Sequence, residues 1–387
     1  MKKIKNNDLK TGHYFFTGKF YFMLKSVKFC SIVYIVLKIT FFQGEHTMYR
    51  KILSLILCGL LLTFVGCNKS QNVDNSNNDE SKPQVAKVYI NPLTGEQGEQ
   101  FKDSAQKRPV AIMVNNISIA QKVQTGLAKA DIVYETEVEG GITRLMAVFQ
   151  DISKVEKIGT VRSARYAYVD LSMGHNAVYV HHGQDPVYCK PHLKDTQTLI
   201  LGTNNAGVRI RNGLSSEHTL YGYGEKIWNV LVDRGYDLEL KDAKNWQNFA
   251  DAKTSVKFEN IATTINVPFS SAYKSVFKYD TESGKYIRFF KDVERKDYNT
   301  GESEYFKNIF VLVTKIVDYP DGKHRKIDLT QGHGYYCVNG TYVPIKWVKG
   351  AASDSFVFTN TDGTPLTVSQ GNSWVCIKGD VLKATFE

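Results

Sequence analysis

The stretch DIVYETEVEGGITRLMAVFQ, residues 131–150, decides the fold of this chain. Two runs of alternating apolar and polar residues flank Gly140-Gly141, and two glycines between such runs are typical of a tight β-hairpin. A two-residue turn places Glu137 opposite Arg144. It also puts three carboxylates on one face of the hairpin together with that arginine: Glu135, Glu137 and Glu139. Because side chains alternate along a strand, these glutamates are expected about 6.5–7 Å apart.

The opposite face of this hairpin is expected to be apolar and to face the core. Its members would be Ile132, Tyr134, Thr136, Val138, Leu145, Ala147 and Phe149. The surrounding sequence alternates strand-like and helix-like segments, which favours helices packed on a mixed sheet.

Arginines gather just after the hairpin, in KIGTVRSARYAYVDL, residues 157–171. Ser163 is predicted to cap a helix that begins at Ala164, which places Arg162 and Arg165 at its first turn. The positive end of the helix dipole disfavours cations there. Paired arginines at this position therefore require an anion, either a hairpin glutamate or the phosphate or carboxylate of a ligand. A network of surface salt bridges is the alternative.

Polar side chains also follow other segments. RPVAIMVNN, residues 108–116, is predicted to be a buried strand that ends at Asn115, and AVYVHHG, residues 177–183, is predicted to end at His181. In SSEHTLYGYG, residues 215–224, a histidine and a tyrosine precede a helix and can point back towards the sheet. The candidate ligand-binding residues are therefore Asn115, Glu135, Glu139, Arg144, Arg162, Arg165, His181, His218 and Tyr221.

Six of these candidates are predicted to converge on one cleft: Glu139, Arg144, Arg162, Arg165, His181 and His218. A glutamate and His181 could serve as acid and base, with the arginines holding an anion. Binding without turnover requires less, because these groups recognise a carboxylate, a phosphate or a sugar directly. The nucleophile elbow, the zinc-protease motif and the phosphate-binding glycine loop do not occur in the sequence. A purely structural charge network is the third interpretation.

The motifs VEGGITR, VRSAR, YVH-x-G and a later H-x-L-Y resemble the YerB-like family of bacterial lipoproteins. The resemblance extends from Asn91 to the C-terminus and implies a lipoprotein of the cell envelope. The domain of this family has no established activity. Two residues of this chain depart from the family pattern: Thr219, which follows His218, and Gly222, which follows Tyr221. His182 also replaces a residue that is usually small.

The composition divides the folded part of the chain in two. Residues 88–237 are predicted to form an α/β domain with a mixed sheet, and residues 238–257 form a polar connector where limited proteolysis is expected to cut. Residues 258–387 contain short strand-like segments separated by turn signals such as Asn339-Gly340, which favours a small all-β domain, either a sandwich or a barrel. The predicted fold class is therefore α+β.

The first 66 residues are typical of a leader. They contain 10 Lys/Arg and 2 Asp/Glu, which leaves 39 against 37 in the remainder, so the body is nearly neutral and no nucleic-acid partner is expected. From Met48, a basic start and an apolar core lead to Gly66-Cys67, which is typical of a lipoprotein signal over residues 48–66. Translation is therefore predicted to start at Met48. A transmembrane anchor is the alternative, but about 14 apolar residues fall short of the roughly 20 that a span needs.

Cys67 is the predicted lipidation site, and the polar residues 67–87 are predicted to be a disordered tether. Cys189, Cys337 and Cys376 are expected to be buried thiols, with a Cys337–Cys376 disulfide as the alternative. Their spacing does not indicate a metal site, and no cofactor is expected.

These observations predict a lipoprotein on the outer face of the cytoplasmic membrane, anchored through Cys67. It would bind an anionic or glycan envelope ligand, such as peptidoglycan or teichoic acid, or scaffold envelope proteins. A hydrolase or transferase acting on a cell-wall polymer is the alternative.

Overall fold

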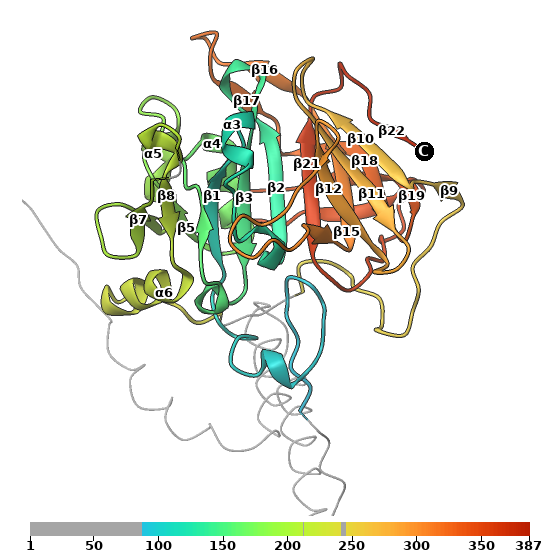
Figure 1. Cartoon of the computed structure of the whole chain (residues 1–387). Helices are drawn as coiled ribbons and strands as arrows, with labels where there is room; N and C mark the ends of the chain where they lie inside the picture. Colours follow the sequence, from blue (N-terminus) through green and yellow to red (C-terminus); the bar gives the residue numbers. More distant parts are fainter. Residues whose placement is uncertain (1–86, 212, 241–244) are drawn as a thin grey trace, which may run out of the picture. The chain divides into compact units, whose positions relative to one another are not determined.

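The computed structural model describes residues 87–211, 213–240 and 245–387, all of which belong to one compact unit. The predicted leader, Cys67 and nearly all of the predicted tether lie outside these residues. The α+β class is confirmed, because a mixed sheet with helices is followed by a part built from strands (Figure 1).

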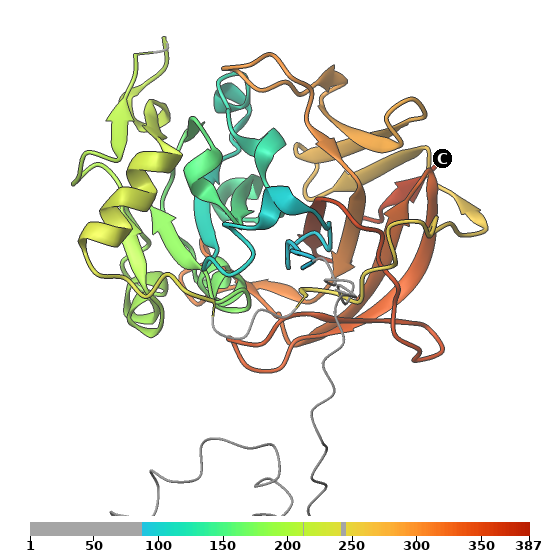
Figure 2. The same ribbon diagram turned by 90° about the horizontal axis from the view of Figure 1, so that it is seen from below.

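One large mixed sheet runs through both parts of the described chain (Figures 1 and 2). Its strand order is β20-β19-β18-β15-β21-β2-β3-β1-β5-β6, and β9 pairs with β19. The strands are β1 Val110–Asn115, β2 Ile132–Glu137, β3 Thr143–Phe149, β5 Val178–His181, β6 Thr198–Ile200, β9 Asn260–Ile261, β15 Asn308–Val313, β18 Gln331–Val338, β19 Thr341–Val348, β20 Val357–Asn360 and β21 Ser373–Lys378. β21 lies parallel between β2 and β15, so a strand from near the C-terminus joins the two parts.

Smaller sheets pack around the large one. A second sheet of the C-terminal part has the order β13-β12-β11-β10-β22, with β14 on β12. Its strands are β10 Thr264–Pro268, β11 Lys274–Asp280, β12 Lys285–Phe290, β13 Val293–Glu294, β14 Tyr305–Phe306 and β22 Thr385–Phe386. The N-terminal part carries the short sheet β4-β8-β7, formed by Ile158–Gly159, Leu220–Gly222 and Gly207–Arg209. β16 (Ile316–Asp318) and β17 (Arg325–Ile327) form a separate hairpin.

The helices are short. The α-helices are α3 Ser118–Gln121, α4 Tyr166–Met173, α5 Cys189–His192 and α6 Gly224–Asp233. Single 3₁₀ turns occur at η1 Glu99–Phe101, η2 Leu127–Lys129, η3 Glu139–Gly141, η4 Ile152–Lys154, η5 Leu193–Asp195 and η6 Ser216–His218.

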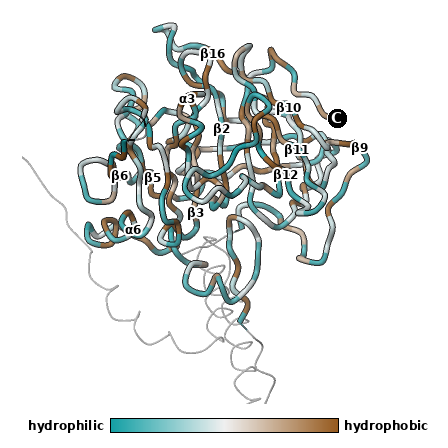
Figure 3. The backbone as a smooth tube through the Cα atoms, viewed as in Figure 1, coloured by the Kyte–Doolittle hydropathy of each residue, from teal (hydrophilic) through white to brown (hydrophobic). Residues whose placement is uncertain are grey.

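Both faces of the large sheet are buried, which is why its central strands are almost continuously apolar (Figure 3). On one face, Ile112 and Leu145 belong to the same cluster as Ile227 of α6 and Phe277 of β11. On the other face, the cluster includes residues of α4 and, in the C-terminal part, Trp347. The helices therefore cover the N-terminal strands, and β10–β12 cover the C-terminal ones on one face.

The predicted register of the β2–β3 hairpin is wrong by one residue. Glu137 pairs with Thr143, and the amide of Val138 donates to the carbonyl of Ile142 at 2.9 Å, so the loop has three residues, Glu139–Gly141. Gly140 and Gly141 both have positive φ, at 72° and 68°. When the register shifts by one residue, each side chain of β3 lies on the same face as the other set of alternate β2 side chains. Arg144 therefore pairs with Thr136 and does not share a face with Glu135.

The predicted helix start is also wrong. α4 begins at Tyr166, Arg165 is its N-cap residue with extended φ/ψ of −135° and 153°, and Ser163 makes no capping hydrogen bond. The chain before the helix is held extended by the ends of two strands. Arg162 donates its amide to Met113 O at 3.2 Å, and Ala164 donates to Gly183 O at 3.0 Å. These strand-like hydrogen bonds replace the expected first helical turn.

The predicted connector packs into the core at its second half. Trp246 is 5% exposed and contacts the rings of Phe310 and Phe358 edge-on, at centroid distances of 5.8 and 6.1 Å. Its ring also lies 5.7 Å from that of His175 in the N-terminal part. The connector is thus anchored to both parts of the chain.

Candidate functional site

The polar candidates lie where parallel strands of the large sheet end. β1 and β5 are parallel, and β1 and β2 both run antiparallel to β3, so β1, β2 and β5 end at the same edge. Asn115 ends β1, His181 ends β5, and Arg144 lies opposite Asn115 near the start of β3. Ligand sites of α/β proteins commonly lie at such an edge, because the loops that follow the strands converge there.

Arg144 is a buried cation at this edge. It is 5% exposed, and its Nη1 donates to the carbonyl of Ser163 at 2.7 Å. Among the described residues no carboxylate forms an ion pair with it. Burial and the charges of Arg165 and Arg162 lower the pKa of Arg144 to about 9, although Glu139 acts in the opposite direction. The guanidinium remains protonated at neutral pH, in surroundings that favour an additional anion.

Arg165 and Glu139 form a two-pronged ion pair beside it. Arg165 Nε and Nη2 donate to the two oxygens of Glu139 at 2.5 and 3.0 Å. Burial raises the pKa of Glu139, but the hydrogen bond and charge of Arg165, together with Arg144, outweigh it and leave that pKa lowered. The three-residue loop makes this pair possible, since it carries Glu139 beyond the strand to the start of α4.

Arg162 and His218 complete the edge on the side of the β7–β8 sheet. Arg162 Nη1 donates to the carbonyl and to a carboxylate oxygen of Glu217, both at 3.0 Å. Asn115 Nδ2 lies 2.8 Å from His218 Nδ1. Because the amide nitrogen can only donate, the imidazole Nδ1 accepts this hydrogen bond. Burial lowers the pKa of His218 against the raising effect of Glu217, which favours a neutral imidazole.

His181 lies at the same edge but inside the protein. It is fully buried, its Nδ1 lies 2.8 Å from Gly183 O, and its Nε2 has no hydrogen-bond partner among the described residues. Burial lowers its pKa, so the ring is neutral. Its position supports the edge from beneath and does not line the surface.

Two predicted candidates lie elsewhere. Glu135 is fully buried on the opposite face, where it accepts hydrogen bonds from Thr143, Ser275 and Trp374 at 2.7, 2.8 and 3.1 Å. The shifted register explains this placement. Tyr221 is 1% exposed in β8, and its hydroxyl donates to the carbonyl of Val123 at 3.1 Å.

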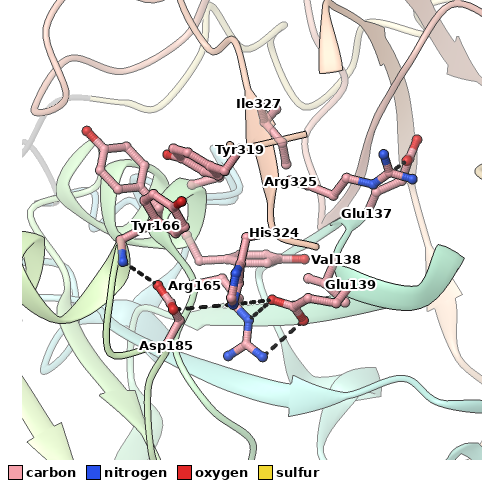
Figure 4. A pocket seen from close by; sticks show the side chains of 13 residues that line it. Glu137, Val138, Glu139, Arg165, Tyr166, Asp185, Tyr319, His324, Arg325 and Ile327 are labelled. Carbon is pink, nitrogen blue, oxygen red and sulfur yellow. Dashed lines mark hydrogen bonds and ion pairs between the residues drawn. The ribbon is translucent and has the colours of Figure 1, made fainter. Parts of the chain in front are cut away.

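A hollow beside the Arg165–Glu139 pair contains residues that the sequence did not reveal (Figure 4). It encloses only about 20 Å³, and it continues past Glu139, Arg165 and His324 into a wider, open depression of about 610 Å³. Besides the pair itself, the polar and aromatic side chains that line it are Glu137, Tyr166, Tyr168, Asp185, Tyr188, Tyr319, His324 and Arg325. The last three come from the β16–β17 hairpin of the C-terminal part. Asp321-Gly322 could be recognised as a turn, but no local pattern tells where a turn some 180 residues away will pack.

His324 links this hairpin to the floor of the hollow. Its Nδ1 lies 2.5 Å from Asp321, and its Nε2 lies 3.2 Å from Asp185 and 3.5 Å from Glu139 (Figure 4). Asp185 also accepts the backbone amides of Tyr188 and Cys189, both at 2.7 Å. These amides and His324 outweigh burial and lower the pKa of Asp185.

Both parts of the chain are similar to known proteins. Residues 93–237 match the N-terminal domain, and residues 265–375 the C-terminal domain, of DUF3048, a protein of unknown function. The chain belongs to the DUF3048 family. It is 31% identical over 349 residues to "Putative lipoprotein YerB" of Bacillus subtilis strain 168, which covers 85% of this chain and 95% of the relative. The crystal structure of the B. subtilis YerB protein matches with a TM-score of 0.67 and 29% identity, covering 77% of this chain and 99% of that one. The resemblance expected from the EGGITR and VRSAR motifs is thus confirmed.

The described part of this DUF3048 chain offers no group of histidine, cysteine and carboxylate side chains suited to hold a metal ion. Cys189, Cys337 and Cys376 are buried free thiols, as predicted. Burial raises the pKa of Cys189 to about 12, so it is a poor nucleophile. No helix among the described residues is long and apolar enough to cross a membrane.

Proposed function

We propose that this DUF3048 protein is a lipid-anchored binding protein of the cell envelope, and that it holds an anionic ligand at the arginines of the sheet edge. The anchor would be Cys67, and the folded part would face outward from the cytoplasmic membrane. The Gly66-Cys67 sequence after an apolar run and the lipoprotein name of the B. subtilis relative support this location.

The observation that carries the binding proposal is the excess of cations at this edge. Arg144, Arg162 and Arg165 lie close enough to influence one another, while their carboxylate partners are Glu139 and Glu217. Arg144 is buried, and no carboxylate in the described part of the chain forms an ion pair with it. A buried charge is costly unless it is paired, so a carboxylate or phosphate from a ligand would compensate it.

The chemistry of the bacterial envelope supplies such anions. Peptidoglycan carries carboxylates, and teichoic acids carry phosphates. The neutral His218 beside Asn115 could add hydrogen bonds to either group. Binding, and not turnover, is proposed, because the buried Cys189 is protonated and His181 lies inside the protein, away from the surface of the edge.

Thermal unfolding in the presence of candidate ligands tests the proposal. Soluble peptidoglycan fragments and glycerol-phosphate oligomers should raise the melting temperature, because a ligand at a hundredfold excess over its Kd stabilises the fold by about 2.7 kcal/mol. Arg165→Gln should abolish the shift without unfolding the free protein. Arg234→Gln, at an exposed arginine after α6, is the control and should retain the shift.

Two results would contradict this proposal. If neither ligand class shifts the wild-type protein, the edge is a structural charge network. If the fragments are converted to new products, as seen by mass spectrometry of the same mixtures, the protein is an enzyme acting on a wall polymer.

The anchor is tested separately in cells. Cys67→Ala should move the protein from the membrane fraction to the soluble or secreted fraction. Cys58→Ala, within the same apolar run, is the matched control and should leave the protein in the membrane. A Cys67→Ala protein that still sediments with membranes would show that another segment is the anchor.

A further inference from the structure

Arg209 adds a further cation to the arginines of the sheet edge. It is the last residue of β7, which pairs with β8 in the short sheet of the N-terminal part (Figure 1). Its Nη1 donates to the carbonyl of Ser216, and its Nη2 donates to His182 Nε2 at 3.0 Å. The residue is exposed to solvent. Two hydrogen bonds therefore fix the guanidinium in place at the surface.

Neither of these partners compensates the charge of Arg209. His182 Nδ1 lies 2.6 Å from the carbonyl oxygen of Leu201, which can only accept, so Nδ1 carries the hydrogen of this bond. Nε2 then accepts from the guanidinium, which has only donors, and this requires the neutral imidazole. The other partner is a backbone carbonyl, and no carboxylate in the described ranges forms an ion pair with Arg209. Its charge is thus held in position without a counter-charge.

Arg162 holds the next carbonyl of the same turn. Its Nη1 donates to the carbonyl of Glu217 at 3.0 Å, while Arg209 holds the carbonyl of Ser216. The two guanidiniums therefore bind neighbouring backbone carbonyls of η6. Arg162 also pairs with the Glu217 carboxylate, whose side chain is 56% exposed. A ligand anion can replace this carboxylate at modest cost, because exposed ion pairs contribute little to stability.

Hydrogen bonds connect three of the arginines in a row. Arg144 donates to the carbonyl of Ser163, the residue that follows Arg162, and Arg162 and Arg209 share the η6 turn. The carboxylates of the edge, Glu139 and Glu217, are paired with Arg165 and Arg162. Arg144 and Arg209, at the two ends of the row, have no such partner in the described part of the chain. One small anion cannot compensate both, because Arg162 and the turn lie between them.

We infer that this edge binds a linear chain with a phosphate in every repeat unit, with one phosphate at Arg144 and Arg162 and another at Arg209. The inference rests on the proposed function and names its ligand class. A polyol-phosphate chain carries successive charges along its backbone, one short unit apart, whereas the carboxylates of peptidoglycan lie on separate peptide branches. Guanidinium groups bind phosphate oxygens through two hydrogen bonds at once. A row of arginines therefore suits successive phosphates.

Calorimetry with glycerol-phosphate oligomers of defined length tests this inference on the purified protein. Glycerol 3-phosphate is the monomer, and the tetramer carries its phosphates in succession. The affinity per phosphate should rise about ten-fold or more from monomer to tetramer, because the second contact is intramolecular. Arg209→Gln should reduce this ratio to about two-fold or less, because the second phosphate loses its cation. Arg234→Gln removes the same charge at an exposed position after α6 and should retain the wild-type ratio.

Chemical modification gives a second readout that needs no variant. Phenylglyoxal reacts with accessible guanidinium groups, and mass spectrometry of the digested protein locates the modified arginines. The tetramer should protect Arg209 in the wild-type protein, whereas the monomer should not. Arg234 should react equally with and without either ligand.

The outcomes separate this inference from the function on which it rests. If monomer and tetramer bind equally per phosphate and Arg165→Gln abolishes both, or if only peptidoglycan fragments bind, the inference is wrong and the proposed function stands. A tetramer that leaves Arg209 reactive also contradicts the inference. If neither the phosphates nor the peptidoglycan fragments bind, both are wrong.

Discussion

Two buried arginines in this protein have opposite surroundings. Arg288 is fully buried, with Glu304 at 3.0 Å and its guanidinium 4.6 Å from the centre of the Trp374 ring. Arg144 is almost as buried but has no carboxylate partner among the described residues. A cation that is kept buried without compensation is more easily explained by binding than by stability, since natural proteins depart from good packing mainly at functional sites.

Arg144→Met is the prediction that follows. Removing an unpaired buried charge should leave the free energy of unfolding unchanged or raise it by about 1 kcal/mol, while abolishing the ligand-induced thermal shift. Arg288→Met is the matched control and should destabilise by about 3–5 kcal/mol, because it leaves Glu304 buried alone. Urea unfolding measures both variants. A comparable loss of stability in Arg144→Met would show that this arginine is also structural.

A second residue makes stability depend on pH. His175 is buried, and its Nε2 lies 2.8 Å from the Tyr134 hydroxyl. Burial and then Lys349 lower its pKa to about 3, below the value of about 6.5 in an unfolded chain. Between these values the unfolded chain binds a proton that the folded chain does not, so His175 makes stability fall as the pH decreases from about 6.5 to about 3.

His175→Gln should therefore flatten the decline of unfolding free energy between pH 6.5 and pH 4, measured by urea unfolding at several pH values. Each pKa unit of difference corresponds to about 1.4 kcal/mol, so the effect should be measurable even if the variant is less stable at pH 7. His333→Gln, at an exposed histidine, should keep the wild-type slope. An unchanged slope in His175→Gln would assign the acid sensitivity to other groups.

At the scale of elements, the sequence predicted those features that depend on neighbouring residues alone. The two glycines marked the β2–β3 hairpin, and both glycines do adopt positive φ. The loop length could not be predicted, because Glu139 joins it to pair with Arg165, the N-cap residue of α4, a contact outside the hairpin. That single extra residue reversed the assignment of faces and moved Glu135 into the core. The start of α4 was missed for a similar reason, since strand ends hold residues 161–164 extended.

The β16–β17 hairpin supplies the next prediction. These two strands pair only with each other among the described strands, so the large sheet does not depend on them. Asp318 and Arg325 are paired across the hairpin, and replacing Tyr319–His324 between them by Asn-Gly gives a compatible two-residue turn. This variant should keep the melting temperature within a few degrees of the wild type and change the affinity for the anionic ligand of the proposed function, because His324 contacts Glu139, the partner of Arg165. Global unfolding on replacement would show that the turn is part of the core.

At the scale of the whole molecule, one sheet unites segments that the family comparison treats as two domains. β21 contributes Trp374, whose indole donates to Glu135, and that carboxylate also accepts from Ser275 of the second sheet. No pattern within β21 indicates that its neighbours are β2 and β15, because the pairing depends on distant parts of the chain. The α+β class and most strands were therefore predictable. The side of the hollow that the β16–β17 hairpin forms was not predictable.

Cleavage of the connector tests whether the two parts of the chain form one folded unit. A specific protease sequence placed between Asp237 and Asn245 should be cut, yet the two fragments should elute together in gel filtration under native conditions. Strand β21 and the anchored Trp246 hold them in one sheet and one core. Dissociation into separately folded fragments would show that each part is an independent domain.

The position of β21 also determines when the pairing of β2 can be completed, because β21 lies near the C-terminus. A chain that is synthesised from its N-terminus contains β2 first, while β21, the strand that pairs with the other side of β2, follows about 240 residues later. During that interval β2 presents unpaired backbone groups, which can recruit a strand from any neighbouring chain. A product that stops before Ser373 never closes this edge. Premature termination or clipping near the C-terminus should therefore produce aggregates or substrates for proteases, and not a shorter working protein.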